Sequence, residues 1–375
     1  MKIYIYGKNR GVYRTKILIN KLLDMKDVEI SFIGFEEEFN KKWLNYLERI
    51  FLFFVSLFLT VRCDVILIPA MQHDTAIIKV AKVLNKKIIV DYYISYFDTF
   101  VYDRKVVNKK SLKAKKLYRR DRNALLYADK CIFLNNAEKE YYCKVVDVES
   151  KKVNSIIVPL VINEKKYAQL NYFKRKTQIM NLCWTGSYIP LQGLDKLIEM
   201  MRYVKKNNLN CHLYIWGDKE EKATLYRELI KENELEKYIT IHNEWGDVEK
   251  WEKFIIENCD VSMGIFGDSC KAKTVCANKV VDGVAFRTPV ITAYSKGAEE
   301  FFKDNEGVYF TRNTPKDIYD VVNKLYLSKI EDISPGLQKS QEIYKRVFSE
   351  KAFKNNLNKI IFCENEKIID SKGGE

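Results

Sequence analysis

Short apolar runs alternate with helical patterns along the first half of the chain. These runs are rich in β-branched residues and are typical of strands: KIYIYG (2–7), VEISFIG (28–34), VILIPA (65–70), IIVDYY (88–93), CIFLNN (131–136) and SIIVPL (155–160). Segments with helical periodicity separate most of them, as in VYRTKILINKLL and DTAIIKVAKVLN. Continuous apolar strands that alternate with helices predict a parallel sheet covered by helices on both faces.

The alternation stops after Pro159 and then restarts. A lysine-rich polar segment, NEKKYAQLNYFKRKTQ, lacks clear periodicity and is the candidate linker. Strand and helix patterns then resume as NLCWTG, DKLIEMMRYVKK, HLYIWG, KATLYRELIKEN, ITIHNEW, DVEKWEKFIIENC, DVSMGIFG, NKVVDGVA and PVITA. We predict an α/β protein with two doubly wound domains, 1–165 and 179–345, a linker at 166–178, and a C-terminal helix and tail at 346–375. Ligands of such folds bind beyond the carboxyl ends of the strands or between the domains.

Composition narrows the class of protein and of partner. The 375 residues are 47% hydrophobic, which favours a globular chain, and they carry a net charge of +14. That charge fits an anionic partner such as a nucleotide phosphate, a lipid head group or a nucleic acid, although it also fits a lysine-rich composition without functional meaning. Nine scattered cysteines without a CxxC pair and no signal peptide before MKIYIYG predict reduced thiols and a cytoplasmic protein. Three histidines far apart in sequence argue against a histidine-rich metal site.

Two further segments bear on membrane association. The run Ile50–Val61 is apolar but shorter than the ~20 residues of a membrane span, so we predict a buried helix and leave an interfacial helix open. The densest basic cluster follows it in the chain: Arg104, Lys105, Lys109, Lys110, Lys113, Lys115, Lys116, Arg119, Arg120 and Arg122. Such a cluster is usually a solvated helix face. Together with the apolar run it could instead meet anionic lipid at the inner membrane face.

Four loops at predicted strand ends in the second half are candidate binding sites. They contain Gly186-Ser187, Gly217-Asp218, Gly267-Asp268 with Lys271, and the helix start Asn278-Lys279 with Asp282. Glycine lets the backbone approach a ligand, and the free N–H groups of a helix start favour phosphate. Lys279 and Asp282 are three residues apart and share a helix face, where they could equally form an ordinary surface pair.

These loops resemble the second domain of retaining GT-B glycosyltransferases of the group 1 type, similar to family 4. The matching segments are WTGSYIPLQGLDKLIE, LYIWGDKEE and GIFGDSCKAKTVCANKVVDGVAFRTPVITA. In the first domain PAMQHD, IIVDYYISYFDTFVYDRK and RRDRNALLYADKCIFLNNAEKEYY resemble one bacterial branch of this family. The resemblance implies two Rossmann-like domains facing a cleft, with C-terminal helices that cross back to the first domain. It also implies transfer of a sugar from a nucleotide diphosphate to an acceptor hydroxyl in cell-surface polysaccharide or glycoconjugate synthesis.

The resemblance assigns roles to the second-domain residues. Asp282 stands where the family has a Glu that binds the ribose, and Lys271 and Lys279 fall where the diphosphate binds. Gly186 and Ser187 would donate hydrogen bonds to the same group, and the remaining loop residues complete the donor site: Gly217, Asp218, Gly267, Asp268 and Asn278. The chain departs from the family pattern at four positions, namely Ser187, Gln192, Thr274 and Arg287. Ser187 and Gln192 replace a basic pair, Thr274 replaces a second Glu, and Arg287 replaces a Gly.

The first domain supplies candidates for the acceptor side. The loop after the first strand, with Gly7, Arg10, Gly11 and the nearby Arg14, could face an acceptor or the donor phosphates, and it lacks the GxGxxG pattern of a dinucleotide cofactor. We expect no cofactor, and no metal ion because no DxD motif is placed to hold one. The catalytic candidates are the strand-end residues His73, Asp91 and Asp98. Each also has a structural interpretation, the histidine in the interior and the carboxylates as helix caps.

Three other functions remain open on the sequence alone. A non-catalytic GT-B subunit is suggested by Thr274 and by the missing basic pair. A nucleotide-sugar epimerase would need more acid and base side chains at strand ends than the chain offers. Nucleic-acid binding is allowed by the charge, but the basic cluster holds one aromatic residue, Tyr118, and matches no known module. For the transferase, the acceptor would be a saccharide or a lipid-linked sugar.

Overall fold

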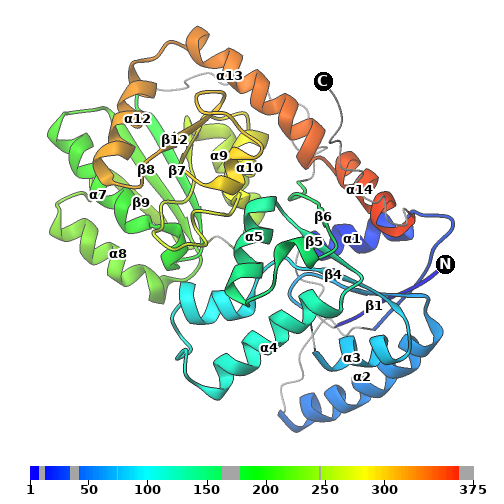
Figure 1. The fold of residues 1–375 in the computed structure, drawn as a ribbon. Coiled ribbons are helices and arrows are strands. Elements are labelled where there is room, and N and C mark those ends of the chain that lie inside the picture. The colour runs from blue at the N-terminus through cyan, green and yellow to red at the C-terminus, as the bar shows by residue number, and fades with distance from the viewer. Residues whose placement is uncertain (8–12, 34–41, 74, 163–177, 245, 363–375) are drawn as a thin grey trace, which may run out of the picture.

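The computed structural model describes residues 1–7, 13–33, 42–73, 75–162, 178–244 and 246–362. It contains two six-stranded parallel sheets with helices around each (Figure 1). The first sheet has the order β2-β1-β3-β4-β5-β6 and the second β12-β11-β10-β7-β8-β9. The α/β class, the division into two sheets and the parallel register that the sequence predicts are therefore confirmed.

The first unit contains the apolar runs of the first half as strands. They are β1 (Lys2–Ile5), β2 (Glu29–Phe32), β3 (Val65–Ile68), β4 (Lys87–Asp91), β5 (Lys130–Phe133) and β6 (Ser155–Ile157). Between them run α1 (Tyr13–Leu23), α2 (Lys42–Arg62), α3 (Thr75–Val83), the short π-helix η1 (Asp98–Asp103), α4 (Leu112–Tyr127), α5 (Asn136–Val145) and the 3-10 turn η2 (Ser150–Lys152).

The second unit repeats the scheme. Its strands are β7 (Met180–Gly186), β8 (Cys211–Gly217), β9 (Ile239–His242), β10 (Val261–Met263), β11 (Val290–Ala293) and β12 (Val308–Thr311). Its helices are η3 (Pro190–Gln192), α7 (Leu194–Lys206), α8 (Glu220–Glu232), α9 (Val248–Asn258), α10 (Asn278–Ala285), α11 (Lys296–Glu299) and α12 (Pro315–Leu327). Strand β12 and helices α11 and α12 are elements that the sequence interpretation missed.

Helix starts follow the chemistry of the residues that precede them. The side chains of Ser111, Asn135, Asp247 and Thr314 each accept a hydrogen bond from the third backbone N–H of the helix that follows. Helix α10 differs, because Ala277 precedes it and no side chain caps its first turn. The N–H groups at that helix start remain available to a ligand.

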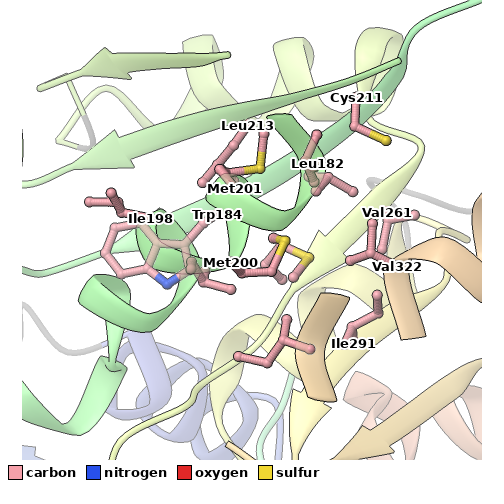
Figure 2. Close-up of a cluster of buried hydrophobic side chains, with 14 of the residues drawn as sticks. Leu182, Trp184, Ile198, Met200, Met201, Cys211, Leu213, Val261, Ile291 and Val322 are labelled. Atoms are coloured by element: carbon pink, nitrogen blue, oxygen red, sulfur yellow. The ribbon is translucent and has the colours of Figure 1, made fainter. Parts of the chain in front are cut away.

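The core of the second unit lies between its sheet and the helices that cover it (Figure 2). Trp184, Leu182 and Leu213 are fully buried on the sheet, and Met200 and Met201 of α7 pack against them. Every residue of the central strand β7 is buried, which explains why it reads as an apolar run rather than as an alternating pattern.

The C-terminal helices return to the first unit, as the resemblance implied. Helix α13 (Ile330–Ile343), the turn η4 (Tyr344–Phe348) and α14 (Glu350–Phe362) run from the second sheet to a position beside α1 (Figure 1). Phe353 and Leu357 of α14 pack in one buried cluster with Leu18 of α1. Lys21 and Glu350 form an ion pair of 2.7 Å across the same contact. The predicted linker and the end of the tail lie mostly outside the described residues.

The apolar run Ile50–Val61 is a helix, but it is not buried as we predicted. It forms most of α2, and the side chains of Phe51, Phe54 and Phe58 are 57%, 63% and 53% exposed. Ser56 and Thr60, on the opposite face, are the buried ones, and Ser56 accepts a hydrogen bond from the Tyr4 hydroxyl at 2.8 Å. The polar Ser56 and Thr60 lie four positions apart on the buried face, whereas polar side chains usually mark the exposed face of a helix, so the pattern of the run did not show which face would meet the sheet.

Candidate functional site

A cavity of about 310 Å³ lies between the two units, where the carboxyl ends of their strands meet. Tyr93 follows β4 and Leu134 follows β5, while Gly186 ends β7 and Ile265 follows β10. Six of the predicted donor-site residues line this cavity: Gly186, Ser187, Lys271, Asn278, Lys279 and Asp282. The structure thus gathers in one place residues that are up to 96 positions apart in sequence.

Lys279 is the decisive feature of the cavity. It lies in the first turn of α10, is only 9% exposed, and its Nζ has no hydrogen-bond partner among the described residues. The ammonium group lies 4.0 Å from the centre of the Trp184 ring and next to Gly186. Gly186 has a φ of +147°, and a Cβ there would come within 3.0 Å of Lys279 Nζ. Burial lowers the pKa of Lys279 well below its ordinary value.

A buried lysine whose Nζ has no hydrogen-bond partner among the described residues is costly to keep charged unless an anion neutralises it. The uncapped start of α10 adds its own partial positive charge and free N–H groups at the same place. Asn278, the first residue of the helix, forms a side-chain hydrogen bond with Tyr93 of the first unit. This corner of the cavity has the chemistry of a phosphate site.

Asp282 lies one turn further along α10, on the same face as Lys279. Burial raises the pKa of Asp282 to about 7, the nearby Glu252 raises it further, and Lys279 lowers it. The carboxylate can therefore gain or lose a proton near neutral pH. In its ionised form it can accept hydrogen bonds from two hydroxyl groups.

Lys271 connects the two units. Its Nζ donates a hydrogen bond of 2.8 Å to Thr99 Oγ1 and lies 3.9 Å from Asp98 Oδ2, both in η1 of the first unit. Asp98 accepts a hydrogen bond from the Tyr141 hydroxyl, and its Oδ2 has no hydrogen-bond partner among the described residues. Burial raises the pKa of Asp98, whereas Tyr141 and Lys271 lower it.

Glu138 is a cavity residue that the sequence interpretation missed. It is 3% exposed, it accepts hydrogen bonds from Asn135 Nδ2 and from the Tyr142 hydroxyl, and it lines the same cavity as Lys271. Burial raises its pKa to about 8, although the charge of Lys271 and other neighbours lower it. The spacing Asn135-x-x-Glu138 is a capping pattern, and that signal marks a helix start without showing that the helix faces a cavity.

Other predicted residues of the second unit lie close to this cavity but outside its lining. Asp218 binds Lys222 at 2.7 Å, and Gly217 leaves room for the Tyr188 ring, which a Cβ would approach to 1.9 Å. Gly267 and Asp268 line a second, larger cavity, where Asp268 accepts a hydrogen bond of 2.6 Å from Lys196.

The catalytic candidates of the first unit are separated. His73 is fully buried, its Nε2 lies 2.8 Å from Asp121 Oδ1, and its ring stacks on Tyr92. Asp91 forms a buried ion pair with Arg14, with 2.7 Å between its Oδ2 and Arg14 Nε. His73, Arg14 and Asp91 line neither of these two interdomain cavities. Asp98 lines the larger one.

The side chain of Arg14 is buried and binds interior groups of the first unit, so it does not form part of a phosphate-binding loop. Beside Asp91, it donates hydrogen bonds to the carbonyl oxygens of Pro159 and Val158 at 2.9 and 3.0 Å. Gly7 lies two residues beyond the end of β1 and has a φ of +100°. Arg10 and Gly11, the other two residues predicted for this loop, lie outside the described residues.

Comparison with known proteins gives the family context. Residues 174–344 match the family model of glycosyl transferases group 1. The second unit is therefore similar to a group 1 glycosyl transferase domain over these residues. The GT-B fold extends over the whole chain, as the similarity to solved structures shows. No curated protein sequence matches the chain.

Three solved structures illustrate the similarity of the fold. Sucrose-phosphate synthase from Thermosynechococcus elongatus is 12% identical with a TM-score of 0.70, covering 96% of this chain and 98% of its own. HepE from Anabaena, in complex with UDP and glucose, is 10% identical with a TM-score of 0.66 and coverages of 96% and 99%. WaaG, a glycosyltransferase involved in lipopolysaccharide biosynthesis, is 11% identical with a TM-score of 0.67 and coverages of 97% and 100%.

Two departures from the group 1 pattern have a clear structural setting. Arg287, in place of the family's Gly, has a φ of +60°, a left-handed conformation that glycine adopts most easily. Thr274, in place of a Glu, lines the larger cavity, and its hydroxyl donates a hydrogen bond of 2.9 Å to the carbonyl oxygen of Lys271. Arg287 thus adopts a backbone conformation that suits glycine, while Thr274 offers no carboxylate.

Proposed function

We propose that the chain transfers a sugar from a nucleotide diphosphate sugar to an acceptor hydroxyl, with retention of configuration. The observation that carries this proposal is the buried Lys279 at the uncapped start of α10, whose Nζ has no hydrogen-bond partner among the described residues, within the segment that matches group 1 glycosyl transferases. The similar fold of HepE, which holds UDP and glucose, supports a nucleotide-sugar donor. The base and the sugar of the donor stay open.

The donor would bind along α10. Its diphosphate would neutralise Lys279 and accept hydrogen bonds from the backbone N–H groups of the first helical turn and from Ser187. Its ribose would donate hydrogen bonds to Asp282. Lys279 and the helix dipole would stabilise the negative charge that develops on the leaving diphosphate, which is a metal-independent way to assist its departure.

Asp98 is the residue that we assign to the acceptor side. It lines the larger cavity, its Oδ2 has no hydrogen-bond partner among the described residues, and Lys271 places it beside the donor cavity. From there it would orient the acceptor hydroxyl by accepting its hydrogen bond. His73 and Asp91 would act indirectly as positioning residues, since both are engaged with buried partners.

The place of action that we propose is the cytoplasmic face of a bacterial inner membrane, in the synthesis of a cell-surface polysaccharide or glycoconjugate. Within the described part of the chain, no helix is sufficiently long and apolar to cross a membrane. The exposed Phe51, Phe54 and Phe58 of α2 would instead lie in the lipid interface, with Arg62 stacked 4.3 Å from the Phe58 ring. A lipid-linked acceptor fits this arrangement.

The test is a calorimetric titration of the full chain with UDP, GDP and their sugar conjugates. Assays of donor hydrolysis and of sugar transfer accompany it. We expect one of these nucleotides to bind with one-to-one stoichiometry, and turnover to persist in the presence of EDTA. A folded protein that binds none of them would overturn the proposal. Tight binding without hydrolysis or transfer to any acceptor would favour a non-catalytic subunit, for which the lost carboxylate at Thr274 is the structural argument.

A further inference from the structure

The larger of the two interdomain cavities has a volume of about 1470 Å³ and shares no lining residue with the donor cavity. The segment 269–276 separates them, because its residues Ser269, Cys270, Lys273 and Thr274 line one cavity while Lys271, Val275 and Cys276 line the other. Asp98 faces the larger cavity and Lys271 the smaller, with 3.9 Å between their charged atoms. A molecule in the larger cavity would therefore lie next to the donor.

One wall of this cavity is strongly basic. Five cationic side chains from the first unit line it: Lys105 and Lys109 before α4, Lys115 and Arg119 on α4, and Lys144 on α5. Each is exposed, and none forms an ion pair with another residue in the described part of the chain. Lys115 and Arg119 are four positions apart, so they lie on the same face of α4.

Five carboxylates also line this cavity, but with Lys196, Lys273 and Lys296 of the second unit the lining has eight cationic side chains. Asp98 accepts from Tyr141 and faces Lys271, and Asp268 binds Lys196. Asp103 hydrogen-bonds with Ser269, and Asp147 accepts from the Tyr118 hydroxyl at 3.0 Å. The fifth, Asp195, is in the first turn of α7 on the opposite wall. The cavity lining therefore keeps a net positive charge, and a cleft concentrates the electric field of such charges.

Aromatic rings lie between these charges. Phe97, Tyr102, Tyr118 and Tyr141 line the cavity, and Lys109 Nζ is 5.2 Å from the centre of the Tyr102 ring. Rings with a polar edge suit a sugar, which has apolar C–H faces and hydroxyl groups. A solvated helix face would need neither the cleft nor the rings, so the ordinary explanation of a charge run does not account for this wall.

From this arrangement we propose that the acceptor is a phosphorylated saccharide whose phosphate or diphosphate binds to Lys109, Lys115 and Arg119. The proposal rests on the transferase function, since it assigns the second substrate of the same reaction. The sugar ring lies against the aromatic residues, and its hydroxyl points to Asp98. The chemistry that the wall recognises is a phosphate on a sugar, whether that phosphate is free or attached to a lipid.

The experiment uses the full chain saturated with its nucleoside diphosphate, so that the donor site is occupied, and then titrates it with inorganic pyrophosphate. Two triple variants remove the same number of charges from the same segment. K109Q/K115Q/R119Q changes residues that line the cavity, and K110Q/K113Q/K116Q changes exposed residues that do not. We expect the first to raise the pyrophosphate Kd about tenfold or more, and the second to change it less than about twofold. Nucleotide affinity stays unchanged in both.

The outcomes separate this proposal from the proposed function. If no nucleoside diphosphate binds to the wild type, the function fails, whereas nucleotide binding without pyrophosphate binding overturns only the acceptor proposal. Equal weakening in the two variants would also overturn it, because a diffuse field alone would then explain the binding. Competition by glucose 1-phosphate supports a soluble phosphosugar, and competition only by phosphatidylcholine vesicles that carry a polyprenyl diphosphate supports a lipid-linked one. Absence of competition by either overturns the proposal.

Discussion

Lys271, in the second unit, reaches across the interface to Thr99 and Asp98 in the first. Its Nζ lies 2.8 Å from the Thr99 hydroxyl oxygen and 3.9 Å from Asp98 Oδ2, and only 8% of its side chain is exposed. The same residue lines the donor cavity. Lys271 thus connects the proposed donor cavity with Asp98, the carboxylate that we assign to the acceptor.

Replacing this residue should affect the reaction more than binding of the donor. In K271M, Asp98 loses its nearby cation and the units lose a contact, so we expect kcat for transfer to fall about 10- to 100-fold. The donor KM should rise less, because Lys279 and the α10 start remain. Steady-state kinetics measure the two constants, and K303M, which changes an exposed lysine away from both cavities, is the control. A change confined to KM would contradict this assignment.

Lys279 should show opposite effects on stability and on binding. K279M removes a buried ammonium that has no hydrogen-bond partner in the described chain, so the unliganded protein should be at least as stable as wild type in urea. The same change should weaken binding of the nucleoside diphosphate about 10- to 100-fold, because a charge-assisted contact is lost. Calorimetry and urea unfolding provide the two measurements. The exposed Lys316 gives the matched control K316M, for which nucleotide affinity should be unaltered.

Donor affinity should rise with pH through neutrality. The pKa of Asp282 is raised to about 7 by burial, so the carboxylate is mostly protonated at pH 6 and mostly ionised at pH 8. If the ribose needs the ionised form, affinity should increase about tenfold between these values. UDP-glucose is a suitable probe, since its diphosphate has no pKa in this range. In D282N the dependence should disappear, and D282A should abolish binding without unfolding the protein. Unchanged affinity in D282A would show that Asp282 is not the ribose ligand.

The Arg14–Asp91 pair should stabilise the fold without contributing to the donor site. Both side chains are 5% exposed or less, so R14M leaves the Asp91 charge buried without its partner. We expect the free energy of unfolding to fall by about 3–5 kcal/mol. The double variant R14M/D91L should recover part of this loss. Nucleotide affinity, measured under conditions where each variant is folded, should stay within about twofold of wild type.

Glu138 should make the stability of the protein depend on pH. The pKa of Glu138 is about 8 in the folded state, whereas the unfolded chain has the usual glutamate pKa of about 4.5. Between pH 4.5 and pH 8 the folded state therefore keeps a proton that the unfolded state releases. This contribution to stability is fully present below the unfolded pKa and is lost as pH rises through 8. E138Q cannot ionise, so the unfolding free energy of the variant should gain relative to wild type from pH 5 to pH 9. Parallel urea curves at four pH values test this, and a constant difference would contradict it.

The elements of the fold were largely readable from the sequence. Strands such as β3 and β4 are continuous apolar runs, and α7 and α9 have a helical period, because parallel strands are buried on two faces and helices on one. Strand β12 was missed although the equally short β3 was predicted: three of the four residues of β12, VYFT, are apolar, against all four of β3, VILI.

The group of residues at α10 was also predictable in part. Asn278, Lys279 and Asp282 are neighbours on one helix, so local sequence brings them together whatever the rest of the chain does. The exposed face of α2 was not predictable in this way, because its buried face carries the polar Ser56 and Thr60 and only packing against β1 and α3 selects that face.

Which polar residues meet was decided by the tertiary structure. The sequence allowed Arg14 to bind a phosphate. In the structure, the packing of α1 on the first sheet places Arg14 beside Asp91, which is 77 positions away in sequence. Lys271 meets Thr99 across 172 positions, and Glu138 enters the cavity only because the two units face each other. The sequence determines which segments form helices and strands, because backbone geometry and side-chain burial give each element its own spacing of apolar residues. Pairing of buried charges depends on distances in space, and those follow from how the two sheets and the returning C-terminal helices pack.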